Sequence, residues 1–471
     1  MPSFWDYLDV MECGWLKFAA DETTTVVIEP VDANTNPLTS VFVVTTTAGK
    51  TVSYTLADNV LTLTVPPGAQ CRVETSGDRG QPVYVASLSP VTTPVGGTVD
   101  TWDGTQNAAV TGRTLVFPAG ITDITANASG GWSEKLLPVE DGATVFIPGN
   151  AWVIGSLDLR GSTGYTVSGH GTLSGEYEDN ATVEALPTFA EKYEYSALLG
   201  DTPLDAEVSG ITIVKSPFYS IATAFNFHSD LLILVPYVDN SDGLKPLAEI
   251  GGAGRAFTVE NCAIWVGDDA VDLNYWRQNG SVTNCLISTS ASSCFLHSYT
   301  TETYADPIYG FAITVSDCTV RSVCEYYFTA GSEPGGGIEG GAVIQCWNDA
   351  YRTDTNLGVF NVTYRNLQVV SDDAGINCVL MWIGSRRYPW GAGVERDGYG
   401  NSSNWDFDGV TLSHVPAEIS KLRGIDAINT PNAIAINNLS IGGIPVGARN
   451  HAQFFDIDEE CFNITFDGRS V

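Results

Sequence analysis

Short runs in which apolar and polar residues alternate fill the first part of the chain. Between residues 20 and 88 they include "TSVFVVTTTAG", "KTVSYTLADN" and "VLTLTVPPGA". Alternation with a period of two predicts half-buried β-strands, and a series of short strands separated by turns is typical of a β-sandwich. The next stretch, residues 89–112, is poor in large apolar residues and predicts a linker. We therefore expect a β-sandwich domain with its linker over residues 1–112.

A different regularity begins near residue 114 and continues along the rest of the chain. The heptapeptides "TVENCAI" at 258, "SVTNCLI" at 281, "TVSDCTV" at 314 and "TYRNLQV" at 363 carry Asn or Asp in fourth place, and three looser copies carry Gly or Asn there. Successive copies begin 23 to 51 residues apart. This spacing suits coils of roughly two dozen residues, some with long loops, and predicts a solenoid of parallel strands over residues 113–471. The expected fold class is all-β.

The fourth-place residues are predicted to form the turn between two sheets of the solenoid. Asn, Asp and Gly tolerate left-handed backbone conformations there, and stacked amides can bond along the solenoid axis. The residues that follow them, which include Cys262, Cys285 and Cys318, should point into the core. Because the ten cysteines show no CxxC or zinc-like spacing, no metal site is predicted.

The charge of the chain narrows the class of partner. There are 471 residues with 55 acidic and 22 basic side chains, so the formal net charge is -33. A field of this sign repels nucleic acid, anionic membranes and polyanionic polysaccharides. We therefore expect a neutral or cationic partner, with no nucleic acid and no membrane. No run reaches transmembrane length, and residues 1–25 show no recognisable secretory signal.

Three aspartates stand in two stretches that are otherwise rich in small and apolar residues. Asp242 belongs to "SDGLKP", and Asp268 and Asp269 belong to "WVGDDAVDLN". Asp268 follows Asp242 by 26 residues, or about one coil, so the two can occupy adjacent rungs, which lie about 4.8 Å apart. Asp269 would face the opposite side of a regular strand, but Gly267 permits a bend that turns both side chains outward.

Carboxylates this close together cannot all ionise freely, because mutual repulsion raises at least one pKa. A protonated acid then stands beside a carboxylate base, which is the pair that glycoside hydrolysis needs. The alternative is that the aspartates are turn residues of the ladder, or ligands of a structural calcium ion. Both interpretations stay open on the residues alone.

Six further residues near the aspartates are candidates for contact with a substrate. The four aromatic side chains offer flat faces that suit sugar rings, although they could equally pack on the solenoid core. The histidine could bond a substrate hydroxyl or hold an aspartate, or could be a packing residue. The predicted substrate-binding residues are Lys245, Trp265, Tyr275, Trp276, His297 and Tyr299.

Several longer segments carry a resemblance to a known family. They are "DNVLTLTVPPGAQCRVE", "VFIPGNAWVIGSLDL", "VSGHGTLSGE", "GITIVKSPFYS" and the two aspartate segments, and they span nearly the whole chain. The chain resembles the family 49 glycoside hydrolases of dextranase and isopullulanase. The resemblance implies a β-sandwich joined to a right-handed parallel β-helix, no organic cofactor, and hydrolysis of α-linked glucans with inversion. By motif match it implies Asp268 as general acid, with Asp242 and Asp269 holding and activating water.

The sequence departs from that family's pattern near the aspartates. The interval between Asp242 and Asp268 is longer, with "LAEIGGAGRAF" supplying the excess, and Ser241 stands where threonine is usual. Lys245 and the segment "FLHSYT" are also atypical. These departures indicate a divergent branch, with an extracellular or virion-associated location.

The resulting expectation is an inverting hydrolase that cuts a neutral polysaccharide internally, most simply an α-glucan such as dextran or pullulan. A polygalacturonase-like hydrolase is the second hypothesis. It would need G-H-G and R-I-K segments after the aspartates to hold uronate carboxylates, and the sequence has neither there. A noncatalytic β-helix adhesin or phage tail-spike protein that only binds glycan is the third.

Overall fold

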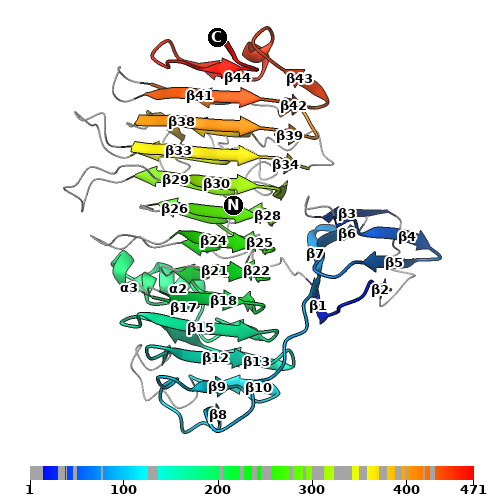
Figure 1. Ribbon diagram of the computed structural model, residues 1–471, viewed down its shortest axis with the longest axis vertical. Helices are drawn as coiled ribbons and strands as arrows, with labels where there is room; N and C mark the ends of the chain where they lie inside the picture. The colour runs from blue at the N-terminus through cyan, green and yellow to red at the C-terminus, as the bar shows by residue number, and fades with distance from the viewer. Residues whose placement is uncertain are drawn as a thin grey trace.

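The protein is all-β, as predicted, and joins an N-terminal β-sandwich to a right-handed parallel β-helix (Figure 1). Right-handed crossovers are the rule for parallel strands that follow one another in a sheet. The computed structural model describes residues 14–29, 38, 40–45, 50–75, 78–125, 136–200, 205–222, 227–235, 241–245, 256–274, 279–289, 293–299, 312–322, 342–348, 358–370, 379–383, 385–387, 395–397, 401–416, 419–424 and 430–471.

The β-sandwich packs a four-stranded sheet on a three-stranded sheet. The first has the order β1 (Gly14–Ala19), β7 (Asp78–Leu88), β6 (Gln70–Thr75) and β3 (Val41–Thr45), and the second β2 (Thr24–Ile28), β5 (Val60–Val65) and β4 (Ser53–Ala57). Alternate residues of these strands face inward, so Leu61, Leu63 and Val65 share one core with Cys71 and Val73. The predicted alternation of apolar and polar positions therefore reflects two half-buried sheets.

Each coil of the β-helix adds one strand to each of three sheets, which we number in the order in which the chain visits them. The first sheet comprises β8 (Val99–Thr101), β9 (Thr114–Val116), β12 (Ala143–Ile147), β15 (Gly164–Gly169), β18 (Asp205–Ser209), β21 (Phe227–Ser229), β24 (Phe257–Glu260), β27 (Gly280–Thr283), β30 (Ile313–Ser316), β33 (Gly358–Arg365), β38 (Asn401–Asp408), β41 (Pro431–Asn437), β45 (Thr465–Phe466) and β46 (Arg469–Ser470). β8 lies inside the predicted linker and pairs with β9, so the first sheet begins before residue 113.

The second and third sheets complete each coil. The second comprises β10 (Gly120–Asp123), β13 (Ala151–Ile154), β16 (Thr172–Ser174), β19 (Thr212–Val214), β22 (Leu232–Val235), β25 (Ala263–Val266), β28 (Leu286–Thr289), β31 (Thr319–Ser322), β34 (Gln368–Val369), β39 (Thr411–Leu412), β42 (Leu439–Ile441) and β43 (Ile444–Val446). The third comprises β11 (Leu136–Pro138), β14 (Ser156–Asp158), β17 (Leu198–Leu199), β20 (Ile221–Ala222), β23 (Leu244–Lys245), β26 (Val271–Asn274), β29 (Phe295–Tyr299), β32 (Ala342–Asn348), β35 (Val379–Ile383), β40 (Ser420–Leu422) and β44 (Phe455–Ile457).

The turn from the first sheet to the second follows the repeated heptapeptide. Asn261, Asn284, Asp317 and Asn366 have φ angles of 55°, 53°, 55° and 50°, which confirms the predicted left-handed turn. The Asn284 amide donates to the Asn261 side-chain oxygen at 2.6 Å, and the Asn366 amide donates to the Asp317 carboxylate at 2.7 Å. These bonds form the expected ladder along the solenoid axis, so the polar turn residues are structural.

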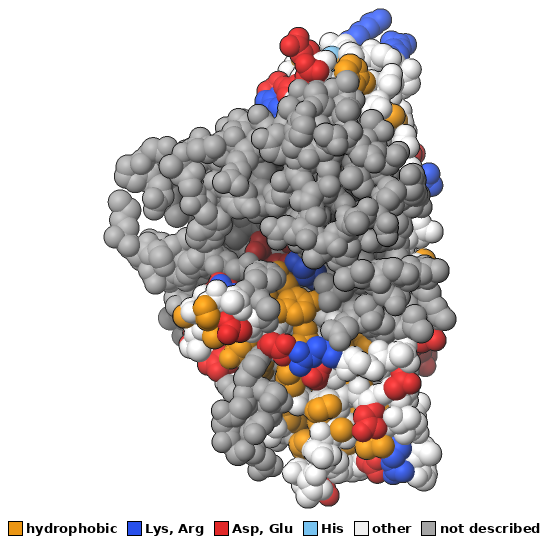
Figure 2. Space-filling model, turned by 90° about the vertical axis from the view of Figure 1, so that its left-hand side faces the viewer, with side chains coloured by type: hydrophobic (Ala, Val, Ile, Leu, Met, Phe, Trp, Pro, Cys, Tyr) orange, Lys and Arg blue, Asp and Glu red, His pale blue; other side chains and the backbone are white. Residues whose placement is uncertain are grey.

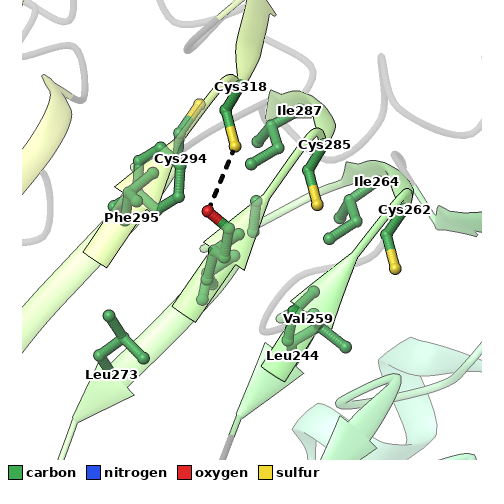
Figure 3. Packing of buried hydrophobic residues seen from close by; sticks show 14 of the residues in the cluster. Leu244, Val259, Cys262, Ile264, Leu273, Cys285, Ile287, Cys294, Phe295 and Cys318 are labelled. Carbon is green, nitrogen blue, oxygen red and sulfur yellow. Dashed lines mark hydrogen bonds between the residues drawn. The ribbon is translucent and has the colours of Figure 1, made fainter. Parts of the chain in front are cut away.

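The residues after these turns fill the interior of the helix. Cys262, Cys285 and Cys318 are fully buried, and Figure 3 shows their thiols in a row, one from each coil. They pack with aliphatic residues from all three sheets in one continuous core. The prediction that they are buried core thiols is confirmed.

The β-sandwich lies against the outer face of the second sheet (Figure 1). Tyr84 of β7 packs there with Trp265 of β25, and their ring centroids are 6.1 Å apart. Lys17 of β1 donates hydrogen bonds to the carbonyl oxygen of Gly210 at 2.5 Å and to the Thr212 hydroxyl at 2.7 Å. Both apolar and polar contacts therefore join the two domains.

Two short helices lie over the outside of the third sheet. They are α2 (Asn180–Glu184) and α3 (Phe189–Tyr193), and α3 begins at a capping box formed by Thr188 and Glu191. The remaining short elements are η2 (His451–Gln453), β36 (Ser385–Arg387) and β37 (Glu395–Asp397). In the part of the chain that the structure describes, no helix has the length and apolar character needed to cross a membrane.

Candidate active site

The three aspartates come together where two neighbouring strands of the third sheet begin. Asp242 lies two residues before β23, and Asp268 and Asp269 precede β26 on the next coil. One carboxylate oxygen from each residue lies within 4.8 Å of the others. The structure thus brings together all three side chains that the sequence predicted to be neighbours.

Backbone bonds and small residues set the register of the two coils here. The Gly243 amide donates to the Asp269 carbonyl at 2.9 Å, which places Asp242 beside Asp269. A Cβ at Gly243 would lie 2.5 Å from the Ala270 carbonyl oxygen, so glycine is needed for this close approach. A larger residue at this position would push the two carboxylate-bearing segments apart.

Ser241 fixes the bend that presents the adjacent aspartates. Its side chain is fully buried, and the hydroxyl donates to the Val235 carbonyl at 3.0 Å and accepts from the Gly267 amide at 2.8 Å. Gly267 directly precedes Asp268. The hydroxyl therefore ties the Asp242 segment to the Asp268 segment.

The three carboxylates differ in their surroundings. Asp242 and Asp269 are buried, with 3% and 8% of their surface exposed, whereas Asp268 is half-buried. The Asp269 carboxylate accepts hydrogen bonds from the Ser293 amide at 2.9 Å and the Ser293 hydroxyl at 2.7 Å. Both donors favour the ionised form of Asp269. Asp268 is the most accessible of the three to a molecule bound at the surface.

The Asp242 carboxyl group is strongly perturbed by its surroundings. Burial raises its pKa well above its usual range, and although Lys245 lowers it, the nearby Asp268, Asp272 and Asp269 raise it further. A proton can therefore remain within this group of acids at a pH at which isolated aspartates are fully ionised.

Lys245 lies beneath the aspartates and is occupied by protein partners. Its ammonium donates to the Tyr219 hydroxyl at 3.1 Å, forms an ion pair with Asp272, and lies 3.5 Å from a carboxylate oxygen of Asp242. Burial alone would lower its pKa, but Asp272, Tyr219 and Asp242 raise that pKa well above its usual range. Lys245 is thus a buried, charged internal counter-ion, and its predicted contact with a substrate stays a prediction.

Two other predicted substrate contacts are wrong because the side chains lie elsewhere. Trp265 belongs to the second sheet, has no exposed surface, and packs between the domains against Tyr84. His297 of β29 points into the helix, where its Nε2 lies 2.6 Å from the Tyr364 hydroxyl and its ring packs edge-on against Trp405. It is a packing histidine, the alternative that the sequence left open.

The other three aromatic candidates stay predictions. Tyr275 and Trp276 lie outside the described residues. Tyr299 is the last residue of β29, one coil beyond β26.

Sequence reasoning missed Asp272 and an aromatic cluster beside the site. Asp272 follows Asp269 by three residues, as Lys245 follows Asp242, so their equal offsets on paired strands could have predicted the ion pair. The aromatic cluster combines residues around β20 with residues near α2 and α3; its members are Tyr177, Val183, Leu186, Tyr193, Tyr195, Phe218, Tyr219 and Ala222. Figure 2 looks at the left-hand side of Figure 1 and shows a hollow near the centre of this face. Acidic and basic side chains lie inside the hollow, and hydrophobic ones lie next to them.

The three aspartate oxygens are also close enough together to share a metal ion. Calcium usually takes six to eight oxygen ligands, and Lys245 already places a positive charge 3.5 Å from Asp242. The donor set thus fits an acid and base cluster better than a calcium site.

Comparison with known proteins supports the architecture. No family model and no curated protein matches the chain. Among solved structures it is similar to Dex49A from Penicillium minioluteum, with a TM-score of 0.62 and 15% sequence identity over 96% of this chain and 83% of that one. It also matches a family 28 exopolygalacturonase from Yersinia enterocolitica, with a TM-score of 0.47 and 11% identity over 96% of this chain and 98% of that one. At this identity, the likeness to Dex49A shows a shared fold.

Proposed function

We propose that the protein is an inverting glycoside hydrolase that cuts a neutral polysaccharide internally, with Asp242, Asp268 and Asp269 as its catalytic residues. The observation that carries this proposal is the approach of one oxygen from each aspartate to within 4.8 Å of the others, with two of the three side chains buried. Such a group provides both a proton donor and a proton acceptor near neutral pH.

The surroundings of each aspartate support distinct roles. Asp268 is the most exposed, which suits a general acid that must reach the glycosidic oxygen. Asp269 accepts two hydrogen bonds from Ser293, an arrangement that suits a base. Asp242 stands beside Asp269 on the next rung and can hold the same water.

Inversion is the outcome that the resemblance of the aspartate segments to family 49 implies. Inverting enzymes usually place acid and base about 6.5–9.5 Å apart, and retaining enzymes about 5–5.5 Å. The nearest oxygens of the three aspartates lie within 4.8 Å of one another, which is closer than the usual inverting separation, and one water can bridge two of them with hydrogen bonds of ~2.8 Å. The anomer released in the first minutes, measured by proton NMR, tests this step: the inverted anomer is expected, and the retained anomer would assign one aspartate as nucleophile.

A neutral α-glucan such as dextran or pullulan is the proposed substrate class. The net charge of -33 opposes polyanions. The resemblance of the aspartate segments to family 49 favours α-linked glucose polymers. An extracellular or virion-associated location belongs to the same proposal, because such polymers are met outside cells.

The test is release of reducing ends from dextran, pullulan, other α-glucans, polygalacturonate and bacterial capsular polysaccharides. Wild type should release sugar from a neutral polymer, and Asp268→Asn should lower kcat by about 10²–10⁴-fold, as expected for loss of a general acid. Asp21→Asn, an exposed change in the β-sandwich, is the matched control and should keep full activity.

The outcomes separate the hypotheses. Faster cleavage of polygalacturonate than of any glucan would favour the polygalacturonase-like enzyme. Glycan binding without release, equal in wild type and Asp268→Asn, would favour the noncatalytic adhesin or tail-spike protein.

A further inference from the structure

We propose that Lys245 is a positioning residue: held in place by Asp272 and Tyr219, it orients Asp242 and favours the ionised form of Asp242 in the proposed hydrolysis. The inference rests on the proposed function and adds to it an internal network that does not touch the substrate.

The geometry of Lys245 leaves its ammonium turned toward the protein. An ammonium group has three donors, and the Nζ of Lys245 lies 3.1 Å from the Tyr219 hydroxyl, within ion-pair distance of Asp272, and 3.5 Å from Asp242. Only 7% of the residue is exposed. Its contacts therefore connect Tyr219 and Asp272, inside the protein, with the carboxylate of Asp242.

The network is anchored on two strands and on the aromatic cluster. Lys245 and Asp272 stand on adjacent rungs, because β23 pairs with β26. The Lys245 ammonium lies 4.4 Å from the centre of the Tyr219 ring, and that ring packs against Phe218 and Tyr193 with centroids 4.3 Å and 5.7 Å away. An ammonium held by a ring and two carboxylates has little freedom to move toward a ligand.

The charges around Asp242 predict opposite effects for the two ends of the network. The charged and titratable groups facing it in the described part of the chain are Lys245, Asp268, Asp269, Asp272 and Tyr219. The Lys245 charge stabilises ionised Asp242, whereas the Asp272 charge opposes it and also draws Lys245 away. Removing Lys245 should therefore raise the pKa of Asp242, and removing the charge of Asp272 should lower it.

The experiment measures the ionisation of Asp242 directly. Protein labelled with ¹³C at aspartate carboxyl carbons is titrated by NMR, and the Asp242 resonance is assigned by its loss in Asp242→Asn. Lys245→Met should move the midpoint upward by ~1 unit or more, the size of effect that a close opposite charge has. Asp272→Asn should move it downward. Lys215→Met, which removes an exposed lysine paired with Glu176, is the control and should leave the midpoint unchanged.

Kinetics then connect the network with the reaction. In the wild type, ionisation of Asp242 should appear as the acidic limb of the profile of kcat against pH. That limb should shift to higher pH in Lys245→Met and to lower pH in Asp272→Asn, with KM changed less than twofold. General damage to the fold would lower kcat without moving the limb in opposite directions.

Two results would overturn the inference while leaving the proposed hydrolase intact: midpoints that move in the same direction in both variants, or a rise in KM with an unchanged kcat in Lys245→Met, which would make Lys245 a substrate ligand. If Lys245→Met does not fold, the downward shift in Asp272→Asn alone supports the network, and its absence contradicts it. If no polymer is cleaved by the wild type, the proposed function fails, and the NMR midpoints still decide the role of Lys245.

Discussion

The protein holds two clusters of charge away from solvent, and they are built in opposite ways. The interdomain cluster consists of Arg72, Glu74 and Arg321, each with 5% or less of its surface exposed. Glu74 lies 2.8 Å from Arg72 Nε and accepts hydrogen bonds from Arg321, one of them at 2.8 Å. The Arg72 guanidinium also lies 4.8 Å from the centre of a ring of Trp265. Every charge here has an opposite charge or an aromatic face beside it.

The candidate active-site cluster, by contrast, has a net negative charge. It consists of four aspartates, Asp242, Asp268, Asp269 and Asp272, and one lysine, Lys245. Positive charge is too scarce to neutralise them, and the neighbouring aspartates add to the effect of burial in raising the pKa of Asp242. The comparison teaches that a buried charge with an opposite partner is costly to unpair, whereas like charges held together have perturbed pKa values, as the proposed hydrolysis requires.

Removing the carboxylate of the interdomain cluster should have the largest effect on stability. Glu74→Gln removes the buried carboxylate that pairs with both Arg72 and Arg321, and the free energy of unfolding should fall by about 3–5 kcal/mol. Urea denaturation at pH 7 measures this change. Glu29→Gln, an exposed change in the same domain, should alter stability by less than about 0.5 kcal/mol. A loss of under 1 kcal/mol in Glu74→Gln would mean that the other contacts between the domains hold them together without this ion pair.

A third buried site, around His297, contains a titratable group that is uncharged in the folded protein at neutral pH. Burial lowers the pKa of His297 to about 3, from an ordinary value of about 6.5. Between these values the unfolded chain binds the proton and the folded protein does not, so stability falls as pH falls below 6.5. At pH 5 the loss from this residue is about 2 kcal/mol relative to pH 7.

The pH dependence can be assigned to His297 with a double variant. His297→Phe with Tyr364→Phe removes both partners of the buried hydrogen bond without leaving either unpaired. Its stability, measured by urea denaturation, should fall by about 2 kcal/mol less than that of the wild type between pH 7 and pH 5. Equal losses in the two proteins would place the acid sensitivity elsewhere, for example at the fully buried His228.

The same repeat in the sequence predicted the coils of the β-helix and the proximity of the aspartates. A ladder of turn residues marks each coil, so Asp242 and Asp268, one coil apart, had to be neighbours. It also predicted Trp265 as a substrate contact, but this side chain lies on the outer face of the second sheet. Tyr84, a residue 181 positions earlier whose contact has no local signal, covers it there. For His297, strand alternation allowed two faces, and only the register with Leu273 of β26 assigns the inward one. Local periodicity thus determines which residues lie on adjacent rungs. Packing between distant segments determines which of those residues are exposed to solvent.

The smallest predicted effect on stability tests the unbalanced cluster itself. Because burial and neighbouring aspartates raise the pKa of Asp242 in the folded protein, the folded state binds a proton that the unfolded state releases more readily. Stability therefore decreases as pH rises above the ordinary aspartate pKa of about 3.9, and at pH 7 Asp242 destabilises the fold. Asn resembles the protonated acid, so Asp242→Asn should raise the free energy of unfolding at pH 7 by about 0.5–2 kcal/mol while hydrolysis is lost.

The gain in Asp242→Asn should shrink as pH is lowered toward the ordinary aspartate pKa of about 3.9, because the folded wild type keeps its proton while a growing share of the unfolded chain binds one. Urea denaturation at pH 7 and pH 4.5 measures it, with Asp21→Asn as the exposed control that should show no such trend. A variant less stable than the wild type at pH 7 would mean that the attraction of Lys245 outweighs burial and the repulsion of three aspartates. Asp242 would then be stabilised as a carboxylate by its opposite charge, as Glu74 is in the interdomain cluster. A raised pKa would no longer account for a proton held at the candidate active site.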